Sequence, residues 1–172
     1  ASARAGGDPI TLPPRTTSVG SWNSPVGVDP FEVSLEQKLA DLVGPTRVLL
    51  GRGAPVRSAF AHMAWTRVHK HLVTTDGVDV AQRFTYGGAG MHCVAVSSDG
   101  RAQRRSAPTS QDGDAWQGGY ERVAALDLTA CAEVVRDEAL ALLDAPPTPA
   151  GARTVILASD QLALQVHESC GH

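Results

Sequence analysis

Cysteines and aromatic residues are scarce in this sequence. Only 3 cysteines occur in 172 residues, and aromatic residues make up 5%. An odd number of cysteines cannot be fully paired in disulfides, and the N-terminal residues show no charged-then-apolar targeting pattern. We therefore expect a reducing compartment, the cytoplasm. The low aromatic content means that the core has to be built from Ala, Val and Leu, which the hydrophobic content of 42% permits.

An excess of charge of one sign and long apolar runs are also missing. The formal net charge is −3, which argues against nucleic acid as the main partner. No apolar run approaches the roughly 20 residues that a helix needs to span a bilayer, so we expect no membrane partner. The length of 172 residues fits one domain, or one domain with flanking pieces.

The N-terminal part is expected to be irregular until a first helix begins. Residues 1–33 lack a sustained hydrophobic period and contain 5 prolines, so we expect an extended connector. Ser34-Leu35-Glu36-Gln37 forms a capping box, which predicts that a helix begins at Ser34. Gly44 followed by Pro45 is the usual signal for a helix end. The strand pairing of residues 45–60 stays open.

The hydrophobic period changes from helical to strand-like between residue 56 and about residue 106. Asp76-Gly77 and Asp99-Gly100 are typical of hairpin turns, and successive hairpins imply an antiparallel sheet. The glycines at 87, 88 and 90 are expected to break the strands and to form a bend or bulge. One face of the strand around residue 80 is predicted to be buried. Its members are Val78, Val80, Phe84 and Tyr86.

Residues 107–120 are polar and glycine-containing, so we expect a loop there, followed by a second helix from about Leu128 to Leu143. Apolar residues at helical spacing form its predicted core stripe. They are Leu128, Ala132, Val135, Ala139 and Leu142. The prolines at 146, 147 and 149 then separate residues 34–150 from a last module, residues 151–172.

The last module is predicted to contain a short buried strand and a helix. Residues 152–158 (ARTVILA) have the composition of a strand, and Ser159-Asp160 offers a helix N-cap. Leu162 and Val166 are spaced as in a helix that packs on its neighbours. The predicted fold is therefore α+β: an antiparallel β-sheet of hairpins backed by helices, followed by a strand and the start of a metal-motif helix.

The final helix carries His167-Glu168-Ser169-Cys170-Gly171-His172. Two imidazoles can bind a zinc ion, and a glutamate between them can act as general base toward an activated water. A spacing of five positions between the ligands would separate the side chains by about 140° on a regular α-helix. Both can reach one ion only if a π-bulge or an unwound helix end absorbs the extra residue. Two histidines that cap or solvate a helix end are the simpler interpretation, but the predicted strand, N-cap and packed helix before the motif favour the metal site.

Other candidate residues are weaker. His69 and His71 lie on one face of a strand-like stretch, and a surface pair is favoured over a metal site, because no carboxylate or thiol has a matching spacing. His92 and Cys93 point to opposite faces of a strand, so they do not easily bind one ion together. Cys170 is expected to be a small apolar helix residue rather than a ligand.

With these residues described, the chain resembles the TldD/PmbA family, whose members are often labelled modulators of DNA gyrase and regarded as zinc metallopeptidases. The similar stretches follow one another in the order of the family and cover nearly the whole chain. They are Ser21-Trp22, residues 28–33, Leu35-Glu36-Gln37-Lys38, Thr75-Asp76-Gly77, Gly88-Ala89-Gly90, Gln103-Arg104-Arg105-Ser106, Gly119-Tyr120-Glu121, Leu157 and, most specifically, residues 160–172.

This resemblance implies a two-part protein, with residues 34–150 in its α+β N-terminal half and residues 151–172 at the start of the metallopeptidase module. It assigns His167 and His172 as zinc ligands, Glu168 as the catalytic glutamate, and a cysteine beyond His172 as third ligand. It also implies unfolded or linear peptides as substrates, and homodimers or heterodimers with a related chain. We therefore expect this chain to be an incomplete piece that by itself binds zinc weakly and is inactive.

Two alternatives remain. The chain could be a non-catalytic partner subunit of such a dimer, although the intact motif argues against this. It could also belong to a different peptidase fold with the same five-residue spacing, such as the dipeptidyl peptidase III family. The hairpin-rich region before the motif disfavours that fold, because those peptidases are rich in helices around the site.

Overall fold

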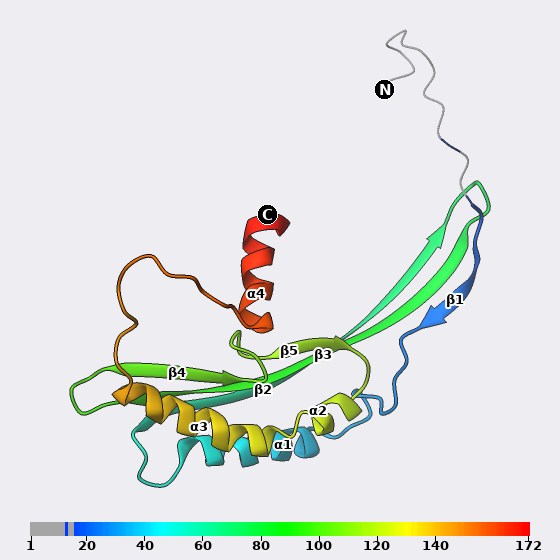
Figure 1. Cartoon of the computed structure of the whole chain (residues 1–172). Helices are drawn as coiled ribbons and strands as arrows, with labels where there is room; N and C mark the ends of the chain where they lie inside the picture. The colour runs from blue at the N-terminus through cyan, green and yellow to red at the C-terminus, as the bar shows by residue number, and fades with distance from the viewer. Residues whose placement is uncertain (1–12, 14–15) are drawn as a thin grey trace, which may run out of the picture. The chain divides into compact units, whose positions relative to one another are not determined.

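The computed structural model describes residue 13 and residues 16–172. Residues 1–12, 14 and 15 of the expected connector lie outside this part. The predicted α+β class is confirmed (Figure 1). The strands are β1 (Val19–Asn23), β2 (Val56–Val73), β3 (Asp79–Val96), β4 (Ala102–Ala107) and β5 (Asp114–Gln117). The helices are α1 (Leu35–Leu50), α2 (Glu121–Ala125), α3 (Leu128–Asp144), α4 (Ser159–Val166) and the π-helix η2 (His167–Gly171).

Strand β3 is the centre of a five-stranded sheet. β2 is paired with it through the predicted turn at Asp76-Gly77, where the Thr74 amide donates to the Val78 carbonyl at 3.0 Å. The other edge of β3 is shared by β1, β5 and β4 in succession along the strand. β4 and β5 are antiparallel to β3, but β1 is parallel to it. The sheet is therefore mixed, because the expected connector contributes a strand.

The chain divides into two compact units, and β2 and β3 contribute residues to both. Unit 1 contains the described residues up to Asn23 and residues 68–84; unit 2 contains residues 24–67 and 85–172. In unit 1, β1 is in register with β3 from Val19 opposite Asp79. The rings of Trp22 and Phe84 lie 5.3 Å apart. The domain boundaries expected near residues 33 and 150 stay predictions.

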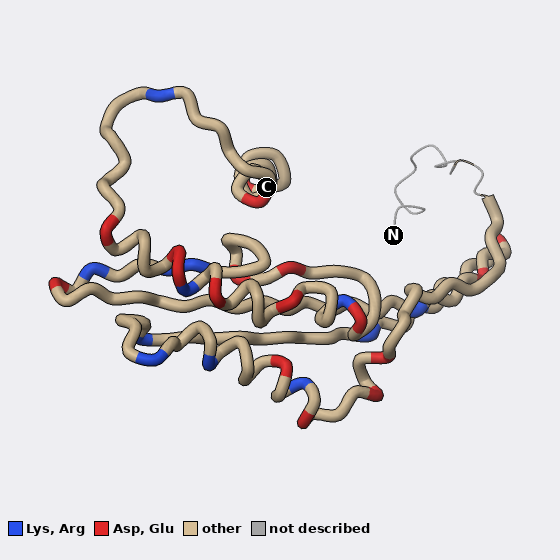
Figure 2. Tube along the Cα trace, turned by 60° about the horizontal axis from the view of Figure 1, so that its bottom comes forward, with Lys and Arg blue, Asp and Glu red and all other residues tan. Residues whose placement is uncertain are grey.

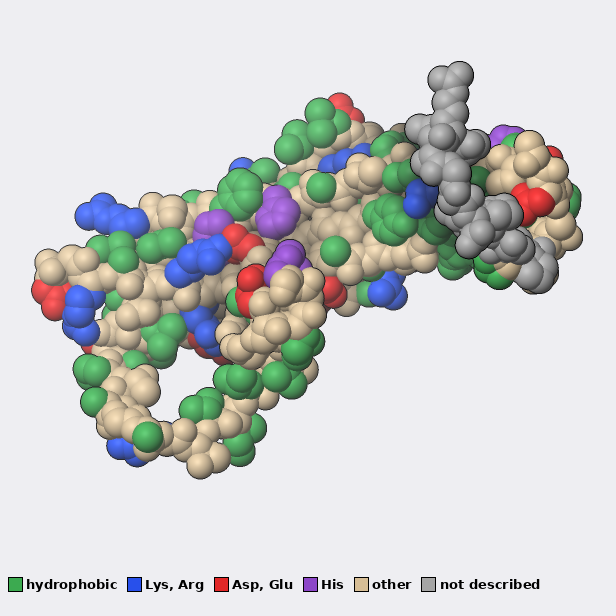
Figure 3. Space-filling view, turned by 90° about the horizontal axis from the view of Figure 1, so that it is seen from above, with side chains coloured by type: hydrophobic (Ala, Val, Ile, Leu, Met, Phe, Trp, Pro, Cys, Tyr) green, Lys and Arg blue, Asp and Glu red, His purple; other side chains and the backbone are tan. Residues whose placement is uncertain are grey.

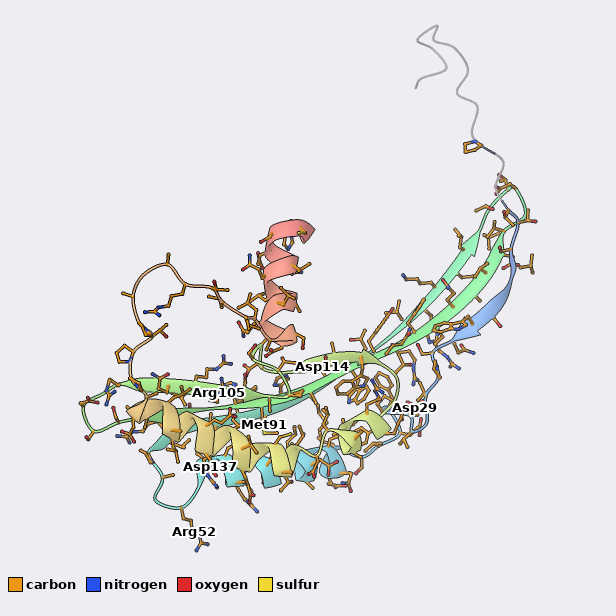
Figure 4. All side chains as sticks on the ribbon, viewed as in Figure 1. Asp29, Arg52, Met91, Arg105, Asp114 and Asp137 are labelled. Atoms are coloured by element: carbon orange, nitrogen blue, oxygen red, sulfur yellow. The ribbon has the colours of Figure 1, made fainter. Side chains whose placement is uncertain are left out.

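The core of unit 2 lies between the sheet and the helices. α1 and α3 contact each other, and α3 also contacts β4 (Figure 1). The odd-numbered residues of β3 from Thr85 to Ala95 are buried on this side. Met91, labelled in Figure 4, and Cys93 are completely buried. The predicted stripe of α3 is confirmed for its first four members, and Leu143 takes the place of Leu142 as the fifth buried residue. The predicted turn at Asp99-Gly100 joins β3 to β4.

The predicted buried face of β3 is wrong at its end in unit 2. Tyr86 is 41% exposed, whereas Thr85 is 2% exposed, and its amide donates to Ser24 Oγ at 3.0 Å. The alternation of apolar and polar residues shows that a strand has two different faces. It does not show which face the helices cover.

Helix α1 begins as predicted but continues past its predicted end. Ser34 is the N-cap, and its side chain accepts from the Gln37 amide at 3.2 Å. Pro45 lies inside the helix, which ends only at Leu50. A proline costs an interior helix hydrogen bond. However, this additional turn buries Leu49 completely, which offsets that cost by about 2 kcal/mol. Residues 46–50 are thus helical, and the strand in the open region starts at Val56.

The glycines of β3 do not interrupt the strand; they allow other backbone and ring atoms to come close. A Cβ on Gly87 would lie 2.1 Å from the Trp65 ring, and a Cβ on Gly90 would lie 1.9 Å from the Asp112 carbonyl oxygen. The loop predicted for residues 107–120 therefore contains strand β5, which pairs with β3 and buries Trp116. The short helix α2 was not predicted.

Residues 152–158 do not form the predicted strand. They have no regular structure and pair with no other strand in the described part of the chain. Ile156 is 96% exposed and Val155 is 69% exposed, and Figure 3 shows hydrophobic side chains on the outside of the segment that joins α3 to α4. A strand needs a partner to satisfy its backbone groups, so composition by itself is not enough here. Within the described residues, no helix has the length and apolar character needed to cross a bilayer.

Candidate metal centre

The candidate centre lies on two consecutive helical segments, α4 and η2. The N-cap of α4 is Ala158, without a side-chain hydrogen bond, so the predicted Ser159 cap is wrong. Asp160 lies in the first turn, where a carboxylate is favourable near the positive end of the helix dipole. At His167 the hydrogen-bonding pattern changes to that of a π-helix, which continues to Gly171. This is the irregularity that the five-residue spacing requires.

The π-turn brings the two histidines together. In a π-helix, residues five apart are hydrogen-bonded neighbours, so His167 and His172 lie one turn apart. Their Nε2 atoms are 2.9 Å apart, and the ring centroids are 4.6 Å apart with the planes nearly perpendicular. At this distance one Nε2–H can donate to the other Nε2, depending on the tautomers. The two rings are therefore in contact, and a metal site that they share stays a prediction.

The nitrogen pair fits a zinc ion after a small opening. Zinc binds imidazole nitrogen at about 2.0–2.1 Å, and a tetrahedral angle would then place the two nitrogens about 3.3 Å apart. The observed 2.9 Å is close to this value. Glu168 follows in the same π-turn, with Oε1 3.8 Å from His167 Nε2. Within the described residues, no group of three or more His, Cys, Asp or Glu side chains is arranged to hold a metal ion.

The motif is open to solvent in this chain. The side chains of His167 and Glu168 are 60% and 62% exposed, and Cys170 is also exposed. Leu162 and Val166, which were predicted to pack on neighbours, are 46% and 52% exposed. That prediction is wrong for the described residues. The helix is regular, but its apolar side chains are not covered.

α4 contacts the rest of unit 2 through the loop between β4 and β5, residues 108–113. Gln161 Nε2 donates to Ser110 Oγ at 2.5 Å, and Gln111 Nε2 donates to the Asp160 carbonyl at 3.4 Å. Hydrogen bonds from Ser110 lower the pKa of the Asp160 carboxyl below its ordinary value. All these contacts involve the first turn of α4.

The β4–β5 loop is itself attached to the sheet. Asp112 Oδ1 lies 2.8 Å from His92 Nδ1, but the two atoms are not aligned as a hydrogen bond. Asp112 Oδ2 accepts from the Arg104 guanidinium. Thr109 Oγ1 donates to the Gly113 carbonyl at 2.5 Å. His92 thus faces the loop, while Cys93 is buried toward α3, so the prediction that they point to opposite faces is confirmed.

The remaining candidates behave as surface groups. In unit 1, His69 and His71 are exposed, and His71 Nε2 lies 2.7 Å from Asp79 Oδ1 on the neighbouring strand. The sequence analysis missed this carboxylate because hairpin pairing, rather than chain spacing, brings it close. Charged residues of both signs are distributed along the chain (Figure 2). The basic residues near 101–105 each pair with a carboxylate: Arg101 with Asp99, Arg104 with Asp112 and Arg105 with Glu138.

Sequence reasoning did not identify Ser110 or Asp112 as residues that bear on the motif. Both lie in a stretch that resembles any polar loop. A signal was present in Gly90, because a glycine inside a strand often marks a close backbone approach, and here Asp112 is the backbone that approaches.

Comparison with known proteins identifies one family. Residues 29–143 match the PmbA/TldA metallopeptidase central domain, and this match covers more than half of the chain. No curated protein matches the chain.

Proposed function

The chain belongs to the PmbA/TldA metallopeptidase family, and from this membership we propose that it serves a zinc-dependent peptidase that cleaves unfolded or linear peptides. The observation that carries the proposal is the convergence of His167 and His172 across the π-turn, with Glu168 between them. A helix end that only used histidines for solvation would not require this distortion. The third ligand of the proposed site is a cysteine that the family resemblance places after His172.

Each residue of the motif has a distinct proposed role. The Nε2 atoms of His167 and His172 would hold the ion. When bound, zinc supplies a Lewis acid that lowers the pKa of a water and polarises a carbonyl. The Glu168 carboxylate accepts a proton from the attacking water and passes it to the departing amine. Its high exposure leaves room for a substrate on the same side as the imidazoles.

The proposed setting follows from the same premises. We propose a cytoplasmic protein, since Cys93, Cys131 and Cys170 are all free. We also propose that it works as a dimer with a like or related chain, as the family resemblance implies.

The test compares Glu168→Gln with the unchanged protein that carries the third ligand. The amide keeps the shape of the carboxylate but cannot accept a proton, so turnover of a linear peptide should fall by about 10²–10⁴-fold while zinc content stays the same. Glu133→Gln on α3, an exposed glutamate, is the matched control and should not affect turnover. Normal turnover in Glu168→Gln at equal zinc occupancy would refute the role of Glu168. Zinc content unaffected by His167→Ala would refute the site.

A further inference from the structure

We propose that the β4–β5 loop, residues 108–113, positions the metal-motif helix, and that Ser110 is the residue that docks it. Ser110 is a positioning residue in this proposal and does not contact the reacting atoms. The assignment of a role in catalysis rests on the proposed function, whereas the docking itself does not.

Hydrogen bonds to the β4–β5 loop hold the first turn of α4. Among the described residues, the hydrogen bonds that join α4 to the rest of unit 2 all end on Ser110 or Gln111. A hollow of about 530 Å³ lies between β4, α3 and Asp160, and Val134 on its α3 side is 57% exposed. The first turn of α4 is therefore not packed on α3. Polar contacts with the loop have to fix its position.

The β4–β5 loop is itself fixed to the sheet by side-chain and backbone contacts. Its Asp112 is held by Arg104 from β4, and its Oδ1 lies 2.8 Å from His92 Nδ1 of β3. Its backbone lies directly on Gly90, where only a glycine leaves room for the Asp112 carbonyl. Thr109 and Gly113 close the loop on itself. Because the loop is fixed in these ways, a hydrogen bond to Ser110 fixes α4 relative to strand β3.

The docking contacts and the metal motif lie at different points along the helix. Seven residues separate Asp160 from His167, and at 1.5 Å per residue this is about 10 Å along the helix axis. A rotation of about 10° at the docking point would then move the imidazoles by roughly 2 Å, which is large compared with the tolerance of a catalytic site. Because both histidines lie on the same π-turn, their mutual distance would not change. Docking therefore decides where the pair lies relative to the rest of a site, and not whether the pair forms.

α4 and η2 together are also too short to be stable in isolation. They contain 8 and 5 residues, and isolated helices of fewer than about 12–15 residues are marginal in water. Loss of docking should therefore appear as loss of helix. Amide hydrogen exchange measures this directly in the full 172-residue chain.

The experiment compares Ser110→Ala with Ser110→Thr, which keeps the hydroxyl. Ser110→Ala should raise the amide exchange rates of residues 162–166 by on the order of two- to tenfold, the loss expected for one or two hydrogen bonds, with an unchanged melting temperature. It should also return the pKa of Asp160 toward its ordinary value, measured by a carboxyl NMR titration. Ser110→Thr should restore both properties.

A matched pair on the helix controls for helix propensity. Gln161 binds Ser110, whereas Gln165, one turn later, donates to Ser169 at 2.7 Å. Gln161→Ala should raise exchange as Ser110→Ala does, and the double variant should add little. Gln165→Ala should leave the exchange of the first turn unchanged. Equal effects of the two glutamine variants, or no effect of Ser110→Ala, would overturn the docking role.

This outcome is distinguishable from failure of the proposed function. Exchange rates and the Asp160 titration do not depend on zinc or turnover. In a protein that carries the third ligand, Ser110→Ala should lower kcat more than it lowers zinc content. If Ser110→Ala raises the amide exchange rates of α4 but changes neither kcat nor zinc content, Ser110 docks the helix and its role in catalysis is refuted.

Discussion

Gly90→Ala is the substitution that most directly tests how the β4–β5 loop is placed on the sheet. The new Cβ would lie 1.9 Å from the Asp112 carbonyl oxygen and 2.4 Å from Gly113 Cα. Ordinary contact begins near 3.4 Å, so the loop would have to shift by about 1.5 Å. Both atoms belong to the backbone, and no side-chain rotation can relieve the contact.

The magnitude follows from two costs. Inserting a methyl group into a closely packed position costs about 1–3 kcal/mol. The shift also disturbs the contacts of Asp112 with His92 and Arg104, which are partly exposed and add at most about 1 kcal/mol. A loss of about 1–4 kcal/mol should lower the melting temperature by roughly 2–16 °C for a chain of this size.

Gly44→Ala is the matched control. Gly44 lies inside α1, and a Cβ there would meet no atom within 4 Å. Alanine is favoured over glycine in a helix by about 0.5–1 kcal/mol, but contact of its Cβ with the ring of Pro45 opposes this gain, so the melting temperature should change by no more than about 4 °C. Both variants are measured by thermal and urea unfolding, together with amide exchange of α4. A Gly90→Ala protein as stable as the unchanged chain, with an unchanged α4, would refute the close approach and the role of the loop.

Two further predictions concern groups in the core of unit 2. Burial and a hydrogen bond to Asp41 raise the pKa of Tyr120, so its stabilising contribution is complete below the ordinary pKa of about 10 and is lost as the pH rises above it. Unfolding measured from pH 8 to pH 12 should show this loss, and Tyr120→Phe should remove that part of the pH dependence. Burial likewise raises the pKa of Cys93, so iodoacetamide at pH 8 should modify the exposed Cys170 first and Cys93 only after unfolding. Equal modification rates in peptide mass spectra would contradict the observed burial.

The elements that could be predicted from the sequence are those with a strong local signal. The capping box at Ser34 and the turn at Asp76-Gly77 each act through hydrogen bonds between neighbouring residues, and both are found where expected. The stripe of α3 was predictable because its period continues over four turns. These features depend little on the rest of the fold.

The errors occurred where a distant contact decided the outcome. Gly44-Pro45 is a valid local stop signal, but burial of Leu49 against the core outweighs it. Residues 152–158 have the composition of a strand, but a strand also needs a partner, which no local pattern supplies. The face of β3 that holds Thr85 is buried because helices cover that side, and their placement is set by the whole of unit 2.

The candidate site also has one feature that a local pattern predicts and one that a distant contact decides. A metal ion shared by His167 and His172 would require a distortion of the helix at their spacing, and the structure has a π-turn at these residues. The position of this turn relative to unit 2 depends instead on Ser110, about 50 residues earlier in the sequence. The position of two histidines relative to each other on one helix can thus be predicted from their spacing in the sequence. The placement of the helix depends on a tertiary hydrogen bond between two polar side chains, and such pairs leave no periodic pattern in a sequence.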